Sequence, residues 1–245
     1  MSDEIKTNRS GQLSSETLSF VEQVRRDVAK VSRVLWESRT LSSSQTFQVY
    51  QRVPNQDIWV SAAYPSLWDD GEVKVAVGGF DGTQYLGKVP KGPGRYTHIF
   101  QTHPRITTVI HAHTPALGAF ASAHKPFTIR YVPITRETIA TEFPLYLDRR
   151  QQEQDFIVEK LNENPHIEAV VEANGGSTFW GDGIIKVGRR IQLIEEGAHF
   201  QILAQSLGGS LPYGPGVLEQ QWRMGLIPQD LAEAALAAAR NPALS

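Results

Sequence analysis

Apolar and polar residues first form a regular pattern near residue 15. From Leu18 to Leu35 apolar residues recur at helical spacing, which predicts a helix over residues 15–36 with one buried face. A serine pair at 14–15 can cap the free amide groups of its first turn. The polar residues 1–13 that precede it are expected to form a loose tail.

The pattern changes after residue 46, where short apolar runs alternate with turn residues and longer helical stretches. The runs predict strands at 47–50, 58–60, 73–77, 106–110, 167–172 and 179–187. Helices are predicted at 94–102, 115–123, 149–162, 190–207 and 228–240. Strands that alternate with helices favour one α/β domain over residues 1–245, with a C-terminal extension from residue 210.

Composition narrows the class of protein. The 245 residues are 40% hydrophobic and 20% charged, enough to bury a core. A net charge of −2 argues against nucleic acid as a partner, and the absence of cysteine excludes disulfides, thiolate metal sites and a cysteine nucleophile. Apolar runs fall short of the roughly 18 residues of a membrane span, and the first residues have no signal-peptide character. We therefore expect a soluble, cytoplasmic protein with no membrane partner.

A pair of histidines at the end of the apolar run 106–110 is the sharpest local motif. In the segment Val109-Ile-His-Ala-His-Thr-Pro115, alternation along a strand places His111 and His113 on one face. Two imidazoles on one face are half of a common metal site. The alternative is that the pair makes only structural hydrogen bonds.

The segment around this motif resembles the class II aldolase/adducin family. Residues 97–124 read THIFQTHPRITTVIHAHTPALGAFASAH, and Phe80-Asp-Gly, Ala173-Asn-Gly-Gly-Ser-Thr-Phe-Trp-Gly181 and residues 194–208 resemble further family segments in the same order. The resemblance implies a three-layer α/β/α fold with a central, mostly antiparallel sheet. It also implies a homotetramer with sites between subunits.

The resemblance further implies a divalent metal ion, Zn, Mn or Fe, held in the family's aldolases by three histidines. His111 and His113 match the first two, whereas Gly175 stands in the place of the third. The acidic residue expected before the histidines is also missing, because residues 82–136 contain no Asp or Glu. Glu137 is the nearest acid downstream, and a His-His-Glu set suits Fe(II) or Zn, so Glu137 is the preferred third ligand. Asn174 is a weaker alternative.

Three further residues are candidates for catalysis or substrate binding. Tyr131 resembles the proton-donating tyrosine of L-fuculose-phosphate aldolases, although a core aromatic residue is the alternative. Arg52 is what remains of the family's phosphate loop, and Arg130 lies beside Tyr131. Both arginines are expected to bind an anionic group. The basic, acid-free stretch 82–136 likewise favours a small anionic substrate.

Two readings of function remain open. In the first, the protein is a metal-dependent aldolase-type lyase that acts on a small anionic hydroxy or keto compound through an enolate-like intermediate. A non-haem iron oxygenase is a variant of this reading that the resemblance also allows. In the second, it is a catalytically inactive, adducin-like oligomeric binding module. The altered metal and phosphate positions favour the second reading, and the joint presence of His111, His113 and Tyr131 favours the first.

Overall fold

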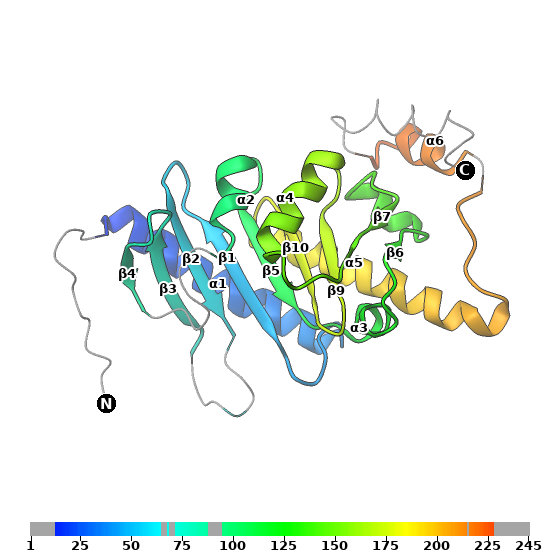
Figure 1. Ribbon diagram of the computed structural model, residues 1–245, viewed down its shortest axis with the longest axis horizontal. Coiled ribbons are helices and arrows are strands. Elements are labelled where there is room, and N and C mark those ends of the chain that lie inside the picture. Colours follow the sequence, from blue (N-terminus) through cyan, green and yellow to red (C-terminus); the bar gives the residue numbers. More distant parts are fainter. Residues whose placement is uncertain (1–12, 65–67, 69–71, 88–94, 215, 228–245) are drawn as a thin grey trace.

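The structure is a computed structural model that describes residues 13–64, 68, 72–87, 95–214 and 216–227 (Figure 1). The helix predicted at 228–240 lies outside these residues, as does most of the tail at 1–13.

An eight-stranded sheet forms the centre of the molecule, in the order β4-β3-β2-β1-β5-β10-β9-β8. Neighbouring strands run antiparallel except β8 and β9, which are parallel. The strands are β1 Phe47–Arg52, β2 Ile58–Ala63, β3 Lys74–Gly79, β4 Gln84–Leu86, β5 Thr108–Ala112, β8 Leu145–Tyr146, β9 Ala169–Glu172 and β10 Ser177–Gly181. A separate pair comprises β6 Phe127–Thr128 and β7 Glu142–Phe143.

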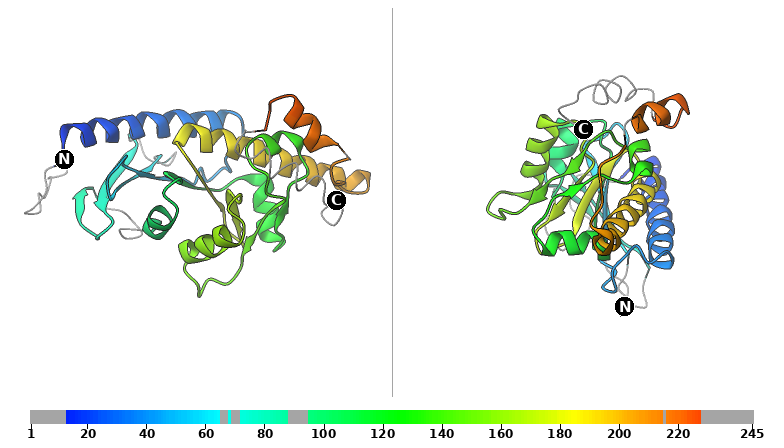
Figure 2. Two further views of the ribbon diagram at one scale, coloured as in Figure 1. Left: turned by 90° about the horizontal axis from the view of Figure 1, so that it is seen from above. Right: turned by 90° about the vertical axis from the view of Figure 1, so that its right-hand side faces the viewer.

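Helices cover both faces of this sheet, as Figure 2 shows from above. On one face lie α1 Ser15–Glu37 and α5 Ile184–Leu203. A Cβ at Gly181 of β10 would lie 2.6 Å from Arg190 of α5, and one at Gly188 of α5 would lie 2.5 Å from Val31 of α1. On the other face lie α2 Thr97–Thr102 and α4 Glu153–Glu163. The predicted three-layer α/β/α arrangement with a mostly antiparallel sheet is therefore confirmed.

The remaining helices are α3 Pro115–Ser122, α6 Val217–Arg223 and the 3-10 helices η1 Val132–Arg136 and η2 Ala204–Leu207. The predicted serine cap at the start of the first helix is confirmed. The Ser14 hydroxyl accepts a hydrogen bond from the Thr17 amide, and Pro115 begins α3. None of the helices in the described part of the chain combines the length and the apolar character that a membrane span requires.

One sequence prediction is wrong near the start of α5. Residues 179–187 were expected to form one strand, but β10 ends at Gly181 and the helix begins at Ile184. Gly183 allows the break, because its φ of 87° belongs to the left-handed region that favours glycine. Ile184 and Val187 are buried, so an apolar start to a buried helix has the appearance of a strand in sequence.

Candidate active site

His111 lies in the middle of a row of side chains that crosses the sheet. Its strand pairs with two neighbours, so that Gln48 of β1 lies opposite it on one side and Thr178 of β10 on the other. Directly opposed residues in antiparallel strands share a face. Thr178 of this row hydrogen-bonds Glu153 of α4, so the row points toward the layer of α2 and α4, away from α1 and α5.

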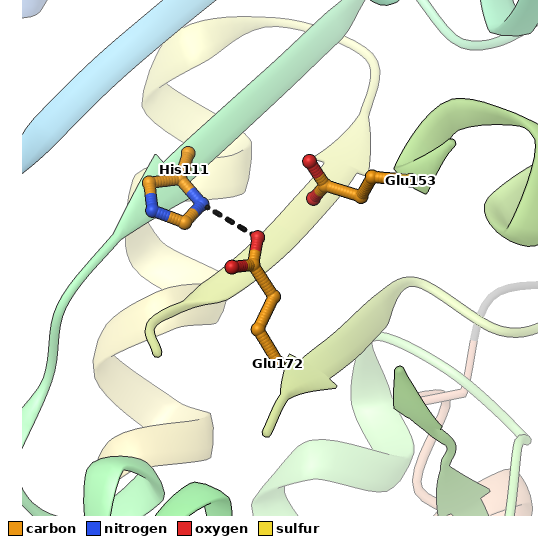
Figure 3. A group of neighbouring side chains, drawn as sticks. All are labelled: His111, Glu153 and Glu172. Carbon is orange, nitrogen blue, oxygen red and sulfur yellow. Dashed lines mark ion pairs between the residues drawn. The ribbon is translucent and has the colours of Figure 1, made fainter. Parts of the chain in front are cut away.

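Two glutamates meet His111 on this face (Figure 3). Glu172 stands at the end of β9, and its Oε1 lies 3.2 Å from His111 Nδ1. Glu153 reaches the same point from the first turn of α4. One ligand atom from each residue lies within 4.8 Å of the others, and His111, Glu153 and Glu172 are only 6%, 8% and 4% exposed. We call these three residues the His111 cluster.

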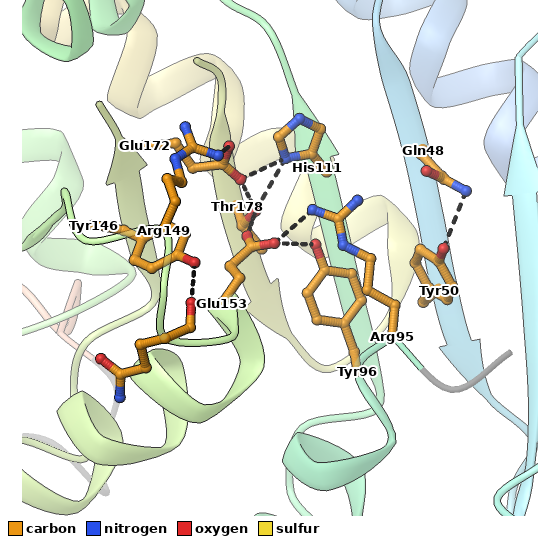
Figure 4. A network of polar contacts seen from close by, with 11 residues as sticks. Gln48, Tyr50, Arg95, Tyr96, His111, Tyr146, Arg149, Glu153, Glu172 and Thr178 are labelled. Atoms are coloured by element: carbon orange, nitrogen blue, oxygen red, sulfur yellow. Dashed lines mark hydrogen bonds and ion pairs between the residues drawn. The ribbon is translucent and has the colours of Figure 1, made fainter. Parts of the chain in front are cut away.

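Further polar groups surround the cluster (Figure 4). Thr178 hydrogen-bonds Glu153 and lies 3.1 Å from His111 Nδ1. Arg95 and the Tyr96 hydroxyl donate to Glu153 Oε2 at 2.5 and 3.1 Å. The Arg149 guanidinium donates to Glu172 Oε2 at 3.2 Å. Each buried carboxylate thus has an arginine partner, which offsets part of the cost of its burial.

The two carboxyl groups have opposite pKa shifts. Burial raises the pKa of Glu153 above its ordinary value, and the nearby charge of Glu172 raises it further. Burial acts in the same direction on Glu172, but the contact with His111, together with Arg149, outweighs it and holds the pKa of Glu172 well below its usual range. Near neutral pH the pair therefore combines an ionised Glu172 with a Glu153 that binds a proton more readily than an ordinary glutamate.

His113 lies next to the cluster and is the first residue after the end of β5. Its ring centroid is 5.3 Å from that of His111, with the two rings nearly perpendicular. A glycine from the turn between β9 and β10 packs against it: a Cβ at Gly176 would lie 2.4 Å from His113 Cδ2. The structure therefore brings His111 and His113 together, and Gly176 of the glycine motif packs against His113.

Glu137 is not brought to the His111 cluster. It caps the end of η1, and its Oε2 lies 3.5 Å from Nη2 of Arg190 on α5, in the helical layer on the other face of the sheet. With Arg190 and Glu168 it lines a cavity of about 480 Å³. This cavity lies beside Thr107, just before the first residue of β5, whereas His111 is near the last residue of that strand. We call Arg190, Glu137 and Glu168 the Arg190 cluster.

The predicted catalytic and substrate-binding residues make other contacts within the chain. The Tyr131 hydroxyl donates to Glu196 of α5 at 2.8 Å, and burial and this contact raise the Tyr131 pKa. Arg52 donates to the carbonyl of Phe100 at 2.9 Å and to Asp57 at 3.1 Å. Arg130 donates to the hydroxyl of Ser210 at 3.0 Å. None of these contacts joins the residue to the His111 cluster.

Sequence reasoning missed Glu153, Glu172 and Arg149. One signal was available for Glu172: it is one of two charged residues in the apolar predicted strand 167–172, and it stands directly before the Ala-Asn-Gly-Gly motif. A buried strand seldom contains a carboxylate unless a partner compensates it. Glu153 had no such signal, because acidic residues are common in the first turn of any helix.

Comparison with known proteins identifies the family. The sequence profile described as Class II Aldolase and Adducin N-terminal domain matches residues 27–202. The chain belongs to this family. Its matched region includes the whole His111 cluster and Arg149, and it ends near the C-terminus of α5. No curated protein matches the sequence.

Several solved structures share the fold. An L-fuculose 1-phosphate aldolase is similar at a TM-score of 0.63 and 18% identity, covering 92% of this chain and 96% of its own. A second, from Glaciozyma antarctica PI12, has a TM-score of 0.61 and 15% identity, with 94% and 92% covered. An aldolase II superfamily protein from Pseudomonas syringae has a TM-score of 0.60 and 18% identity, with 95% and 90% covered. At such identities the likeness supports the fold alone.

Proposed function

We propose that the protein is a metal-dependent aldolase-type lyase that acts on a small anionic hydroxy or keto compound at the His111 cluster. The observation that carries the proposal is the convergence of one imidazole and two carboxylates, all buried, at the end of β5. Membership of the class II aldolase family supports the reaction type.

The donor set suits a divalent ion. Nitrogen and carboxylate oxygen are ligands that Zn, Mn and Fe accept, and a pair of close carboxylates is electrostatically complementary to a cation. His111, Glu172 and Glu153 would hold the ion, with His113 beside them. Bound there, it would act as a Lewis acid on a substrate carbonyl or enolate oxygen.

The surrounding residues fix the position of these donors. Thr178 contacts both His111 and Glu153, so it holds the imidazole and the carboxyl of α4 in one place. Arg95 and Tyr96, at the start of α2 in the same helical layer as α4, keep Glu153 directed at the sheet. Such outer contacts orient ligands and limit solvent access.

The inactive, adducin-like reading keeps one observation in its favour. Each glutamate of the cluster already has an arginine partner, so the group is partly neutralised without an ion. In that reading the purified protein binds no divalent ion at the cluster, and the measurements below separate the two cases.

A metal titration with a chemical readout tests the proposal. Isothermal titration of the metal-free protein with Mn(II) or Zn(II) should give about one ion per chain, and His111→Ala should weaken binding about 100-fold. The loaded protein should also exchange hydrogen for deuterium next to the carbonyl of pyruvate or dihydroxyacetone phosphate, followed by NMR. This exchange reports enolate formation without knowledge of the natural substrate.

His103→Ala is the matched control, because His103 lies at the end of α2 and contacts Thr102. It should leave both ion binding and exchange unchanged. Absence of bound ion from the wild-type protein, or equal binding by His111→Ala, would overturn the proposal.

We also propose that the protein is a cytoplasmic homotetramer. Large apolar side chains are exposed along the end of α5 and the segment after it, among them Phe200, Leu203, Leu207 and Leu211. Contiguous exposed apolar surface is typical of subunit contacts. Light scattering should give about four times 27.2 kDa, and a 27.2 kDa monomer would contradict the assembly.

A further inference from the structure

We propose that Arg149 binds the carboxylate of the substrate and that the glycine at position 175 is what makes room for it. The inference rests on the proposed function, since it assigns the anionic group of that substrate to a residue at the edge of the His111 cluster.

Arg149 is placed to bind a ligand and the cluster together. Its Nη1 donates to Glu172 Oε2 at 3.2 Å and its Nη2 to the carbonyl of Ala173 at 2.9 Å, while the guanidinium lies over the Tyr146 ring at 5.2 Å. These contacts use only part of its N–H donors. Its side chain is 51% exposed, whereas Glu172 is buried, so Arg149 extends from the cluster to solvent.

The guanidinium occupies the place of a missing side chain. A Cβ built at Gly175 would lie 2.9 Å from Arg149 Nη2 and 3.0 Å from Glu172 Oε2. Any residue larger than glycine would therefore displace Arg149 or Glu172. The chain places a charged donor where the family resemblance predicted a third histidine.

The other arginines considered for anion binding are already engaged. Arg52 and Arg130 bind Phe100 and Ser210 elsewhere in the fold, and Arg95 is directed at Glu153. Arg149 is thus the charged donor of this set that contacts the cluster and remains half exposed.

The chemistry of the site favours a carboxylate over a phosphate. A guanidinium fork matches the planar carboxylate in a bidentate arrangement. A phosphate dianion next to the two clustered carboxyl groups, Glu172 and Glu153, would meet stronger repulsion than a carboxylate monoanion. A small hydroxy or keto acid, which carries its oxygen donor beside the carboxylate, would span from Arg149 to the cluster.

Ligand titration of arginine and glycine variants tests the inference. The probes are glycolate, pyruvate and inorganic phosphate, which are titrated into the metal-free and the Zn(II)-loaded protein while the NMR chemical shifts of the protein are followed. Saturable carboxylate binding at millimolar concentration is expected in the wild type. Arg149→Gln should weaken carboxylate binding about 10-fold, and Arg149→Lys should weaken it by a smaller factor. Gly175→Ala should also weaken carboxylate binding, although Arg149 is still present in that variant.

Arg150→Gln is the matched control, because Arg150 is 91% exposed and pairs with Asp148 rather than with the cluster. It should leave the carboxylate dissociation constant unchanged. Equal losses in Arg149→Gln and Arg150→Gln, or no saturable carboxylate binding, would overturn the inference. Tighter, Arg149-dependent binding of phosphate would overturn the assignment of the carboxylate.

The two proposals fail in different ways. If carboxylates bind through Arg149 but the protein never exchanges hydrogen next to a carbonyl, the proposed function fails and the binding site stands. If exchange occurs and Arg149→Gln leaves the concentration of pyruvate at half-maximal rate unchanged, the binding site fails and the function stands.

Discussion

The strands β5 and β10 have a charged cluster near each of their ends, and the two clusters differ in what their arginines contact. In the Arg190 cluster the arginine is 2% exposed, and it contacts the Trp180 carbonyl at 2.6 Å, Glu168 at 2.8 Å and Glu137 at 3.5 Å. In the His111 cluster, Arg149 contacts one carboxylate and remains half exposed.

This difference separates charges that hold the fold from charges that can meet a ligand. A buried arginine whose nitrogens lie within 3.5 Å of oxygens from several elements ties those elements together, here α5, the end of η1, the residue before β9, and β10. An imidazole beside two carboxyl groups with opposite pKa shifts, next to a half-exposed arginine, is a candidate for a reacting site. Buried charge alone therefore does not identify a site; the two clusters differ in whether their arginine remains exposed, at 51% for Arg149 and 2% for Arg190.

The largest expected effect is the removal of Arg190. Arg190→Gln removes the buried cation that contacts Glu137 and Glu168, so the free energy of unfolding in urea should fall by about 3 kcal/mol. Ion binding at the His111 cluster should not change. Arg189→Gln, at an exposed position on the same helix, should cost under about 0.5 kcal/mol. If Arg190→Gln lost more binding free energy for the ion than free energy of unfolding, the Arg190 cluster would not be a purely structural group.

Next in size is the effect of Glu172→Gln on the His111 cluster. The substitution keeps the shape but removes the charge, and the affinity for Mn(II) should fall about 100-fold by calorimetric titration. Glu159→Gln, on the exposed face of α4, is the control and should bind Mn(II) as the wild type does. Unchanged affinity in Glu172→Gln would remove that residue from the site.

The pH dependence of stability tests the Arg190 cluster through Glu168. Burial, despite the opposing charge of Arg190, raises the pKa of Glu168 from 4.5 to about 7. The folded state thus binds its proton more tightly than the unfolded state, and the stabilisation is complete below pH 4.5 and is lost as the pH rises through 7. Between pH 5 and pH 8 the wild type should lose about 2 kcal/mol more than Glu168→Gln in urea titrations. Parallel curves for the two proteins would contradict this assignment.

The smallest effect is expected from a pair of glycines. An added Cβ at Gly176 would lie 2.7 Å from the Ala112 carbonyl and closer still to His113, so Gly176→Ala should cost about 1 kcal/mol or more and weaken ion binding several-fold. Gly118 in α3 has open space around it, and Gly118→Ala should stabilise the protein by up to about 1 kcal/mol. Both are measured by urea denaturation and Mn(II) titration. Equal effects of the two substitutions would show that His113 is not held by the turn.

Periodicity in the sequence was enough to predict most elements, and the resemblance to the family supplied the three layers. The predicted helix 15–36 is observed as Ser15–Glu37, and the predicted strand 106–110 overlaps Thr108–Ala112. Periodicity determines these elements because a buried face repeats at fixed intervals along a helix or strand. The pairing of His111 with His113 also followed from alternation along one strand, which is a local property.

Tertiary structure decided the rest of the candidate site. Glu153 and Glu172 are far from His111 in sequence and meet it only because β9 and β10 pair beside β5 and α4 packs on the same face; Arg149 joins them through Glu172. Glu137, the acid nearest to the histidines downstream in sequence, lies instead in the Arg190 cluster. Local patterns specify which way a side chain faces, but strand order and helix packing determine which side chains it meets, and those contacts join residues widely separated along the chain.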